Sequence, residues 1–180
     1  MSFTKPVQYY QNQEPWRMRI YSNHNDAHQT MASSGSGPTL AADVVATLKD
    51  PSVDPWDLAR LAMNTGCRTY ASGTGWGFFK EVFKAYNFKR LVQSRDIEEL
   101  RKCLDAGGLV VCSMSGGYWF RVENYLLAWQ YDNAYVHCIT AHRSQKTKQP
   151  IDDFVRESRM YFCFYPDDYE EPDDSAKGNE

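Results

Sequence analysis

The hydrophobic pattern of the chain changes its period once, and this change limits the possible folds more than any other feature of the sequence. Between residues 38 and 107, apolar side chains recur at helical spacing. From residue 109 onward they come in short runs of strand length, beginning with Leu109–Met114. Helices first and strands afterwards favour an α+β domain, with N-terminal helices packed on a C-terminal antiparallel sheet, over alternating βαβ units.

Proline, glycine and turn residues set the expected bounds of these elements. Pro38 stands near the first position of the first clear helix, which Asp50-Pro51 ends, and Gly66 suits a left-handed cap for the second helix. The predicted helices cover residues 37–49, 54–65, 75–86, 96–106 and 151–157. The predicted strands cover residues 109–114, 125–129, 134–139 and 160–165, with a hairpin-like turn at 131–133 and a short strand at 7–10.

Four aromatic residues share one face of the predicted third helix. They are Trp76, Phe79, Phe83 and Tyr86, and we expect Thr74 to cap this helix. A stripe of this kind is typical of core packing, which we favour over a role in stacking on a ligand.

Acidic residues are concentrated at the C-terminal end of the chain. Residues 167–180 hold seven acidic side chains and one lysine, so the formal charge of −3 divides into −6 for this end and +3 for the rest. This composition predicts a disordered acidic tail after a single domain at residues 1–166. The weakly positive body has no stripe of lysine and arginine, so nucleic-acid binding is not predicted.

The sequence suggests no membrane segment. It opens with a polar stretch that lacks the basic and apolar regions of a signal peptide, and no apolar run reaches the length of a membrane span. We therefore expect a cytoplasmic protein.

Neither the cysteines nor the histidines suggest a metal site, and no cofactor is predicted. The five cysteines are widely spaced and include no CxxC pair, so we expect small buried thiols rather than a disulfide framework. His24 and His28 flank Asp26, but their segment is not helical in pattern and offers no third ligand.

The stretch Ser33-Ser34-Gly35-Ser36-Gly37-Pro38-Thr39 is the most informative one in the sequence. It resembles the SSGCGPT segment that carries the nucleophile in the bacteriocin-processing (double-glycine leader) branch of the papain-like cysteine peptidases, with Ser36 in place of the cysteine. In that family the nucleophile lies at a helix N-terminus, where the partial positive charge favours a thiolate. On structural grounds alone, Ser36 before Gly-Pro is an ordinary helix N-cap, and the two interpretations are compatible.

Further segments resemble the same family in the same order. Asp54–Ala62 is similar to its second helix, Ser72-Gly73-Thr74-Gly75-Trp76 to its GT-aromatic turn, and Leu104–Met114 to its helix-to-strand passage. Gly116-Gly117-Tyr118-Trp119 is similar to the loop before the histidine strand. The resemblance covers roughly residues 20–165 and implies the papain-like cysteine peptidase fold.

The resemblance also assigns the catalytic positions, and all three depart from the family pattern. Asn124 stands where the family has the histidine base, and Thr140 stands where it has an aspartate or asparagine. A serine hydroxyl is a weak nucleophile unless a base takes its proton, which Asn124 cannot do. The family's oxyanion glutamine has one weak candidate here, Gln29, whose spacing to Ser36 is about one residue too long.

Three hypotheses about function follow. The first is a catalytically inactive relative, a pseudoenzyme, that binds a peptide or protein partner in the ancestral cleft, with the cleft formed by Gly35, Gly37, Trp76, Tyr118, Trp119 and Tyr125. The second is an active thiol hydrolase in which Ser36 replaces a native cysteine and His142 serves as an alternative base. His142 lies two residues after Thr140, so in an extended chain the two side chains point to the same side. The third is an assembly component of bacterial, phage or mobile-element origin.

Overall fold

The computed structural model describes residues 2–70 and 73–172. Its helices are α1 (Met31–Ser34), α2 (Ser36–Leu48), α3 (Pro55–Asn64), α4 (Phe78–Ala85), α5 (Ile97–Asp105) and α6 (Ile151–Glu157). Its strands are β1 (Leu91–Ser94), β2 (Leu109–Met114), β3 (Asn124–Tyr131), β4 (Tyr135–Ile139), β5 (Lys148–Pro150) and β6 (Ser158–Phe164).

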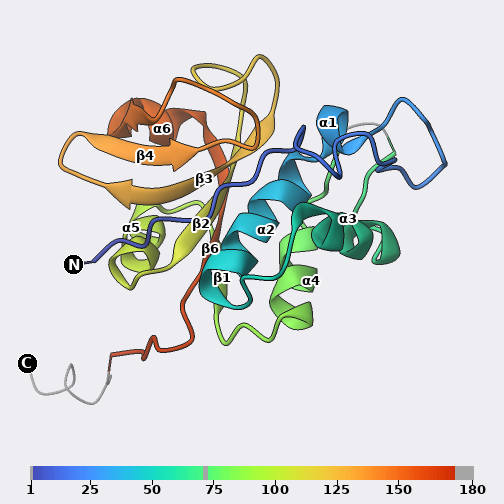
Figure 1. The fold of residues 1–180 in the computed structure, drawn as a ribbon. Helices are drawn as coiled ribbons and strands as arrows, with labels where there is room; N and C mark the ends of the chain where they lie inside the picture. The colour runs from blue at the N-terminus through green and yellow to red at the C-terminus, as the bar shows by residue number, and fades with distance from the viewer. Residues whose placement is uncertain (1, 71–72, 173–180) are drawn as a thin grey trace, which may run out of the picture.

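Within the described residues the strands form one sheet in the order β1-β6-β2-β3-β4-β5, and every neighbouring pair is antiparallel. The central strand β2 is buried at all its positions, because helices cover both faces of the sheet (Figure 1). In the register, Val111 lies opposite Leu127 on one side and Phe162 on the other. The α+β class and the antiparallel sheet predicted from the sequence are confirmed.

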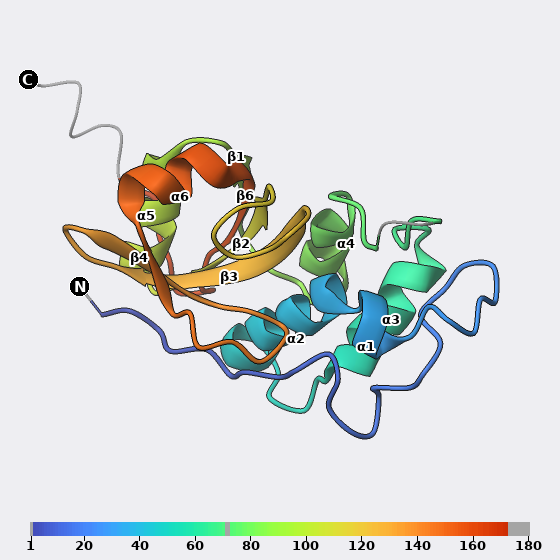
Figure 2. The same ribbon diagram turned by 90° about the horizontal axis from the view of Figure 1, so that it is seen from above.

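The two faces of the sheet carry two separate cores. Val111, Leu127 and Phe162 point to the face covered by α2, α3 and α4, while Val110 and Leu126 point to the face covered by α5 and α6. Seen from above (Figure 2), α2 and α6 lie on opposite sides of β3. The alternation of side chains along each strand therefore gives every central strand two apolar faces.

The predicted third helix begins later than expected. Thr74 forms an isolated bridge with Arg68, and the Gly75 N–H donates to the Cys67 carbonyl oxygen (2.8 Å), so this segment is extended and α4 starts only at Phe78. Trp76 consequently lies before the helix. The core packing predicted for the aromatic stripe is confirmed, since Phe79 is buried on the α2 side of the sheet and Trp76, Phe83 and Tyr86 pack against that core.

The predicted strand at residues 7–10 does not form. This segment runs along α2 instead and is held by single hydrogen bonds: the Val7 N–H donates to Thr47 Oγ1 (2.9 Å) and the Tyr9 N–H to Asp43 Oδ1 (2.7 Å). The short edge strands β1 and β5 were not predicted, since runs of three or four residues give no periodic signal.

After the last strand, the chain turns back onto the body. Tyr169 packs on Tyr165 with ring centroids 4.6 Å apart, and Asp167 pairs with Lys49 at 2.5 Å. The predicted disordered tail begins at residue 167, and its part at 173–180 lies outside the described residues. Among the described helices, none combines the length and the apolar character that a membrane crossing requires.

Candidate functional site

The N-terminus of α2 places Ser36 at the junction of the helices and the sheet. Gly35 joins α1 to α2, and a Cβ there would lie 2.6 Å from the Met31 carbonyl oxygen. A Cβ at Gly37 would lie 2.8 Å from Thr74 Cβ, so only glycine lets the first turn of α2 pack this closely on Thr74. Ser36 is the first residue of the helix, whereas Gly35 occupies the N-cap position expected for Ser36.

Ser36 and Asn124 are in direct contact although 88 positions separate them in the sequence. The Ser36 hydroxyl donates a hydrogen bond of 2.6 Å to Asn124 Oδ1, and the same oxygen accepts the Tyr125 N–H at 2.8 Å. The two positions that the family resemblance assigns to nucleophile and base are thus brought together by α2 and the first residue of β3. An amide oxygen holds the hydroxyl in place but cannot take its proton.

Thr140, the third assigned position, lies just beyond the end of β4 and is 4% exposed. Its hydroxyl donates to the His142 carbonyl oxygen at 2.6 Å, which closes a local turn. The side chain is therefore used to stabilise the backbone at this point of the chain. Nothing in this arrangement orients a base at position 124.

The histidines near the site are engaged elsewhere. His142 is half-buried, its ring packs edge-on against Phe120 at 5.7 Å, and burial lowers its pKa. It is not among the residues that line the pocket beside Ser36. His137 pairs with Asp132 in the hairpin turn at 2.8 Å, as expected from a strand parity that points it away from Thr140.

Gln29 is also committed to another interaction. Its Oε1 accepts a hydrogen bond from Arg68 Nη2 (2.9 Å) and its Nε2 donates to the Tyr70 carbonyl oxygen (3.0 Å). The side chain thus braces the loop after α3 and does not line the pocket.

A pocket of about 420 Å³ opens beside Ser36 and Asn124. Such a volume lies in the range of small-ligand and peptide-side-chain sites. One wall is the extended segment before α4, the other is the start of β3, and the lining comprises Ser36, Thr69, Gly73, Thr74, Gly75, Trp76, Ser113, Val122, Glu123, Asn124 and Tyr125. The Tyr125 hydroxyl donates to the Thr74 carbonyl oxygen at 2.6 Å and joins the two walls, and burial raises the pKa of this hydroxyl.

Of the predicted cleft residues, Trp76 and Tyr125 line the pocket with Ser36, whereas Gly35, Gly37, Tyr118 and Trp119 do not. Trp119 is 7% exposed because its indole N–H donates to Gln149 Oε1 (2.7 Å) in the second core. The Tyr118 N–H donates to Glu157 Oε1 (2.8 Å), which holds that loop against α6. The loop at residues 116–119 therefore packs on the far face of the sheet, away from the pocket.

Glu123 lines the pocket and was not identified from the sequence as a functional residue. It forms an ion pair with Arg159, and its Oε1 accepts a hydrogen bond from the Ser113 hydroxyl at 3.3 Å. The Arg159 guanidinium also stacks over the Trp76 ring, 5.4 Å from the ring centroid. The carboxylate at the pocket is thus charge-compensated.

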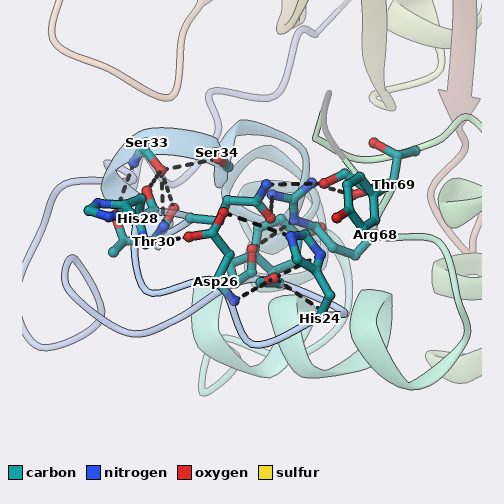
Figure 3. Close-up of polar contacts among 12 residues, drawn as sticks. His24, Asp26, His28, Thr30, Ser33, Ser34, Arg68 and Thr69 are labelled. Atoms are coloured by element: carbon teal, nitrogen blue, oxygen red, sulfur yellow. Dashed lines mark hydrogen bonds and ion pairs between the residues drawn. The ribbon is translucent and has the colours of Figure 1, made fainter.

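Arg68 holds the outer wall of the pocket and was likewise missed in the sequence (Figure 3). It is 1% exposed, and its guanidinium donates to the carbonyl oxygens of Tyr21 (2.7 Å), Thr69 (2.6 Å) and Gly73 (2.9 Å) as well as to Gln29. Burial lowers its pKa, while the Tyr21 ring lies 4.8 Å away. A buried arginine that donates to carbonyl oxygens fixes backbone geometry, here that of Thr69 and Gly73 in the pocket lining.

The loop around His24 and His28 joins the same network (Figure 3). His24 stacks on Tyr70 at 4.0 Å, and Asp26 Oδ1 accepts the His28 N–H at 2.9 Å. In the part of the chain that the structure describes, no group of three or more His, Cys, Asp or Glu side chains is placed to hold a metal ion.

Solved structures with this fold include two peptidase domains. The peptidase domain of Streptococcus ComA, a bi-functional ABC transporter involved in a quorum sensing pathway, superposes with a TM-score of 0.57 at 17% identity, over 74% of this chain and 93% of that domain. A putative C39-like peptidase from Bacillus anthracis gives 0.51 at 20% identity, over 71% and 88%. The chain therefore has the fold of C39 papain-like peptidase domains.

No protein-family model matches the chain, and no match was found among curated proteins.

Proposed function

We propose that this protein is a catalytically inactive relative of the C39 peptidases that binds a peptide or protein partner in the pocket beside Ser36. One observation carries the proposal: the Ser36 hydroxyl donates to Asn124 Oδ1 at 2.6 Å. The contact between the nucleophile and base positions is kept, but the thiol and the imidazole are both replaced. Without a proton acceptor, serine is a poor nucleophile at neutral pH.

Binding does not need the lost groups. The pocket has apolar surface from Trp76, Val122 and Tyr125 and polar groups from Ser36 and Asn124, a combination typical of ligand sites. The double-glycine leader peptide implied by the family resemblance is the first probe to use.

Titration of the 180-residue protein with a fluorescein-labelled leader peptide that ends in Gly-Gly tests this proposal. We expect saturable binding, with the peptide recovered uncut by mass spectrometry. Val122 is 74% exposed and lines the pocket, so Val122→Arg should weaken binding at least about tenfold by obstruction. Val155, exposed on α6, gives the matched control Val155→Arg, which should leave binding unchanged.

Cleavage of the peptide, or the absence of saturable binding, would contradict the proposal. An active thiol hydrolase with His142 as base has no support from the position of that ring against Phe120.

A further inference from the structure

One charged side chain lines the pocket beside Ser36. Among the described residues of the lining, Glu123 alone is charged, and it shares the lining with the aromatic side chains of Trp76 and Tyr125. A carboxylate beside the face of an indole attracts a cation, because both groups present negative charge to it. An anion in the same space would meet the carboxylate, so the lining favours a cationic side chain.

The carboxylate of Glu123 is held at the pocket wall. Glu123 directly precedes β3, and its Oε1 accepts a hydrogen bond from the Ser113 hydroxyl at 3.3 Å. Ser113 belongs to the central strand β2, is 1% exposed and also lines the pocket. The buried hydroxyl therefore positions the carboxylate at the edge of the sheet core.

A cation of this chain already occupies the wall. Arg159 on β6 forms an ion pair with Glu123, and its guanidinium lies 5.4 Å over the Trp76 ring. Arg159 itself is not among the residues that line the pocket. One guanidinium thus uses the carboxylate and the indole together, and this shows which kind of group the wall binds.

An irregularity in the sheet brings Arg159 to this wall. Met160 lies opposite Ser113 and Ser158 lies opposite Met114, so Arg159 is an extra residue with no partner in the register. In a regular strand, Arg159 and Met160 would point to opposite faces. Here Met160 packs against the core on the α2 side, and Arg159 stacks on Trp76, which packs against the same core. Bulges of this kind re-aim side chains beside functional sites.

The ion pair between Arg159 and Glu123 is easily exchanged. The two side chains are 43% and 51% exposed, and ion pairs that are open to solvent contribute little net free energy. A cation inside the pocket would meet the same carboxylate with less screening by water. We infer that the pocket takes a lysine or arginine side chain of the bound peptide, which replaces Arg159 at Glu123 and Trp76; this inference rests on the proposed peptide-binding function.

A set of fluorescein-labelled peptides that end in Gly-Gly tests this inference on the 180-residue protein. The positions before Gly-Gly carry, one at a time, lysine, norleucine or glutamate, and norleucine keeps the aliphatic chain without the charge. At one position we expect lysine to bind at least about tenfold more tightly than norleucine, because it gains a charge-assisted contact with Glu123. Glutamate at that position should bind more weakly than norleucine.

Two variants should change this preference in opposite directions. Glu123→Gln removes the charge and should bring the lysine and norleucine peptides to within about twofold of each other. Arg159→Gln removes the competing cation and should tighten binding of the lysine peptide about threefold relative to the norleucine peptide. A pair that only stabilised the wall would give a change in the same direction in both variants.

Matched controls make the same charge changes at other exposed ion pairs. Glu98→Gln removes the partner of Arg101 on α5, and Arg156→Gln removes the partner of Asp153 on α6. Both should leave the preference for lysine as it is, because neither residue lines the pocket.

The outcomes separate this inference from peptide binding itself. Equal binding of lysine, norleucine and glutamate at every position, or a preference for lysine that survives Glu123→Gln, would overturn the inference and leave peptide binding intact. Weaker binding of the lysine peptide by Arg159→Gln would show that Arg159 does not compete with the ligand, and would overturn the replacement. Failure of every peptide to bind would overturn the proposed function as well.

Discussion

The two sides of Ser36 differ in which part of the chain their buried polar groups hold in place. On the pocket side, Arg68 holds the backbone of Thr69 and Gly73, two residues of the pocket lining. On the other side, Gln11 and Asp43 hold the N-terminal segment against α1, α2 and the end of β4. The comparison shows that buried polar groups support an open pocket on one side of α2 and fix the chain itself on the other side.

The largest effect is expected from removing the support of the pocket wall. Arg68→Met removes the buried guanidinium that donates to the carbonyl oxygens of Tyr21, Thr69 and Gly73, and we expect a loss of about 3 kcal/mol in the free energy of unfolding. Urea denaturation measures it. Arg60→Met makes the same change at an exposed i,i+3 pair on α3 and should cost less than about 0.5 kcal/mol. Similar costs for the two variants would show that Arg68 does not hold the wall.

On the side of the N-terminal segment, Asp43 makes stability depend on pH. Its side chain is fully buried, one carboxyl oxygen accepts the Tyr9 N–H, the other has no partner among the described residues, and burial raises its pKa well above the usual value. The folded state therefore binds a proton that the unfolded chain releases above about pH 4, so this group lowers stability as pH rises from there to the raised pKa.

Asp43→Asn keeps an acceptor for Tyr9 without the ionisation. We expect it to remove a decline of up to about 1.4 kcal/mol per pH unit within that window, and to be more stable than the parent protein at pH 7. Urea midpoints from pH 4 to pH 8 measure the difference. Parallel pH curves for the two proteins would contradict a protonated Asp43.

A smaller effect is expected between the two sides, at Thr140. Thr140→Val keeps the shape but removes the donor to the His142 carbonyl oxygen, which should cost about 1 kcal/mol in the free energy of unfolding. Peptide binding should not change, because the hydroxyl does not line the pocket. A loss of binding without a loss of stability would instead give Thr140 a direct role at the site.

The sequence predicted one side of the cleft much better than the other. Strand β2, the helices and the meeting of Ser36 with Asn124 followed from hydrophobic period and from the order of short motifs. The N-terminal segment has no periodic pattern, and its hydrogen bonds reach residues far along the chain, so the contacts of Gln11 with Ala32 and Ala141 left no local signal. The prediction that Trp119 lines the cleft was wrong, because the sequence of a loop does not show which face of the sheet an aromatic side chain packs on. In the structure the indole N–H donates to Gln149 on β5, on the far face.

The central claim is that Ser36 and Asn124 are in contact, as a nucleophile and a base would be, but that Asn124 cannot accept the proton of the Ser36 hydroxyl. Alkylation by iodoacetamide tests it directly, in a Cys67→Ala background because the other four cysteines are buried. Ser36→Cys alone should react slowly at pH 6, because the N-terminus of α2 lowers the pKa of the thiol below the usual value of about 8.5 but no side chain beside it takes the proton. Adding Asn124→His and Thr140→Asp should give a thiol that reacts rapidly at pH 6. Rapid reaction of Ser36→Cys alone at pH 6 would show that a base already serves position 36, and would contradict the account.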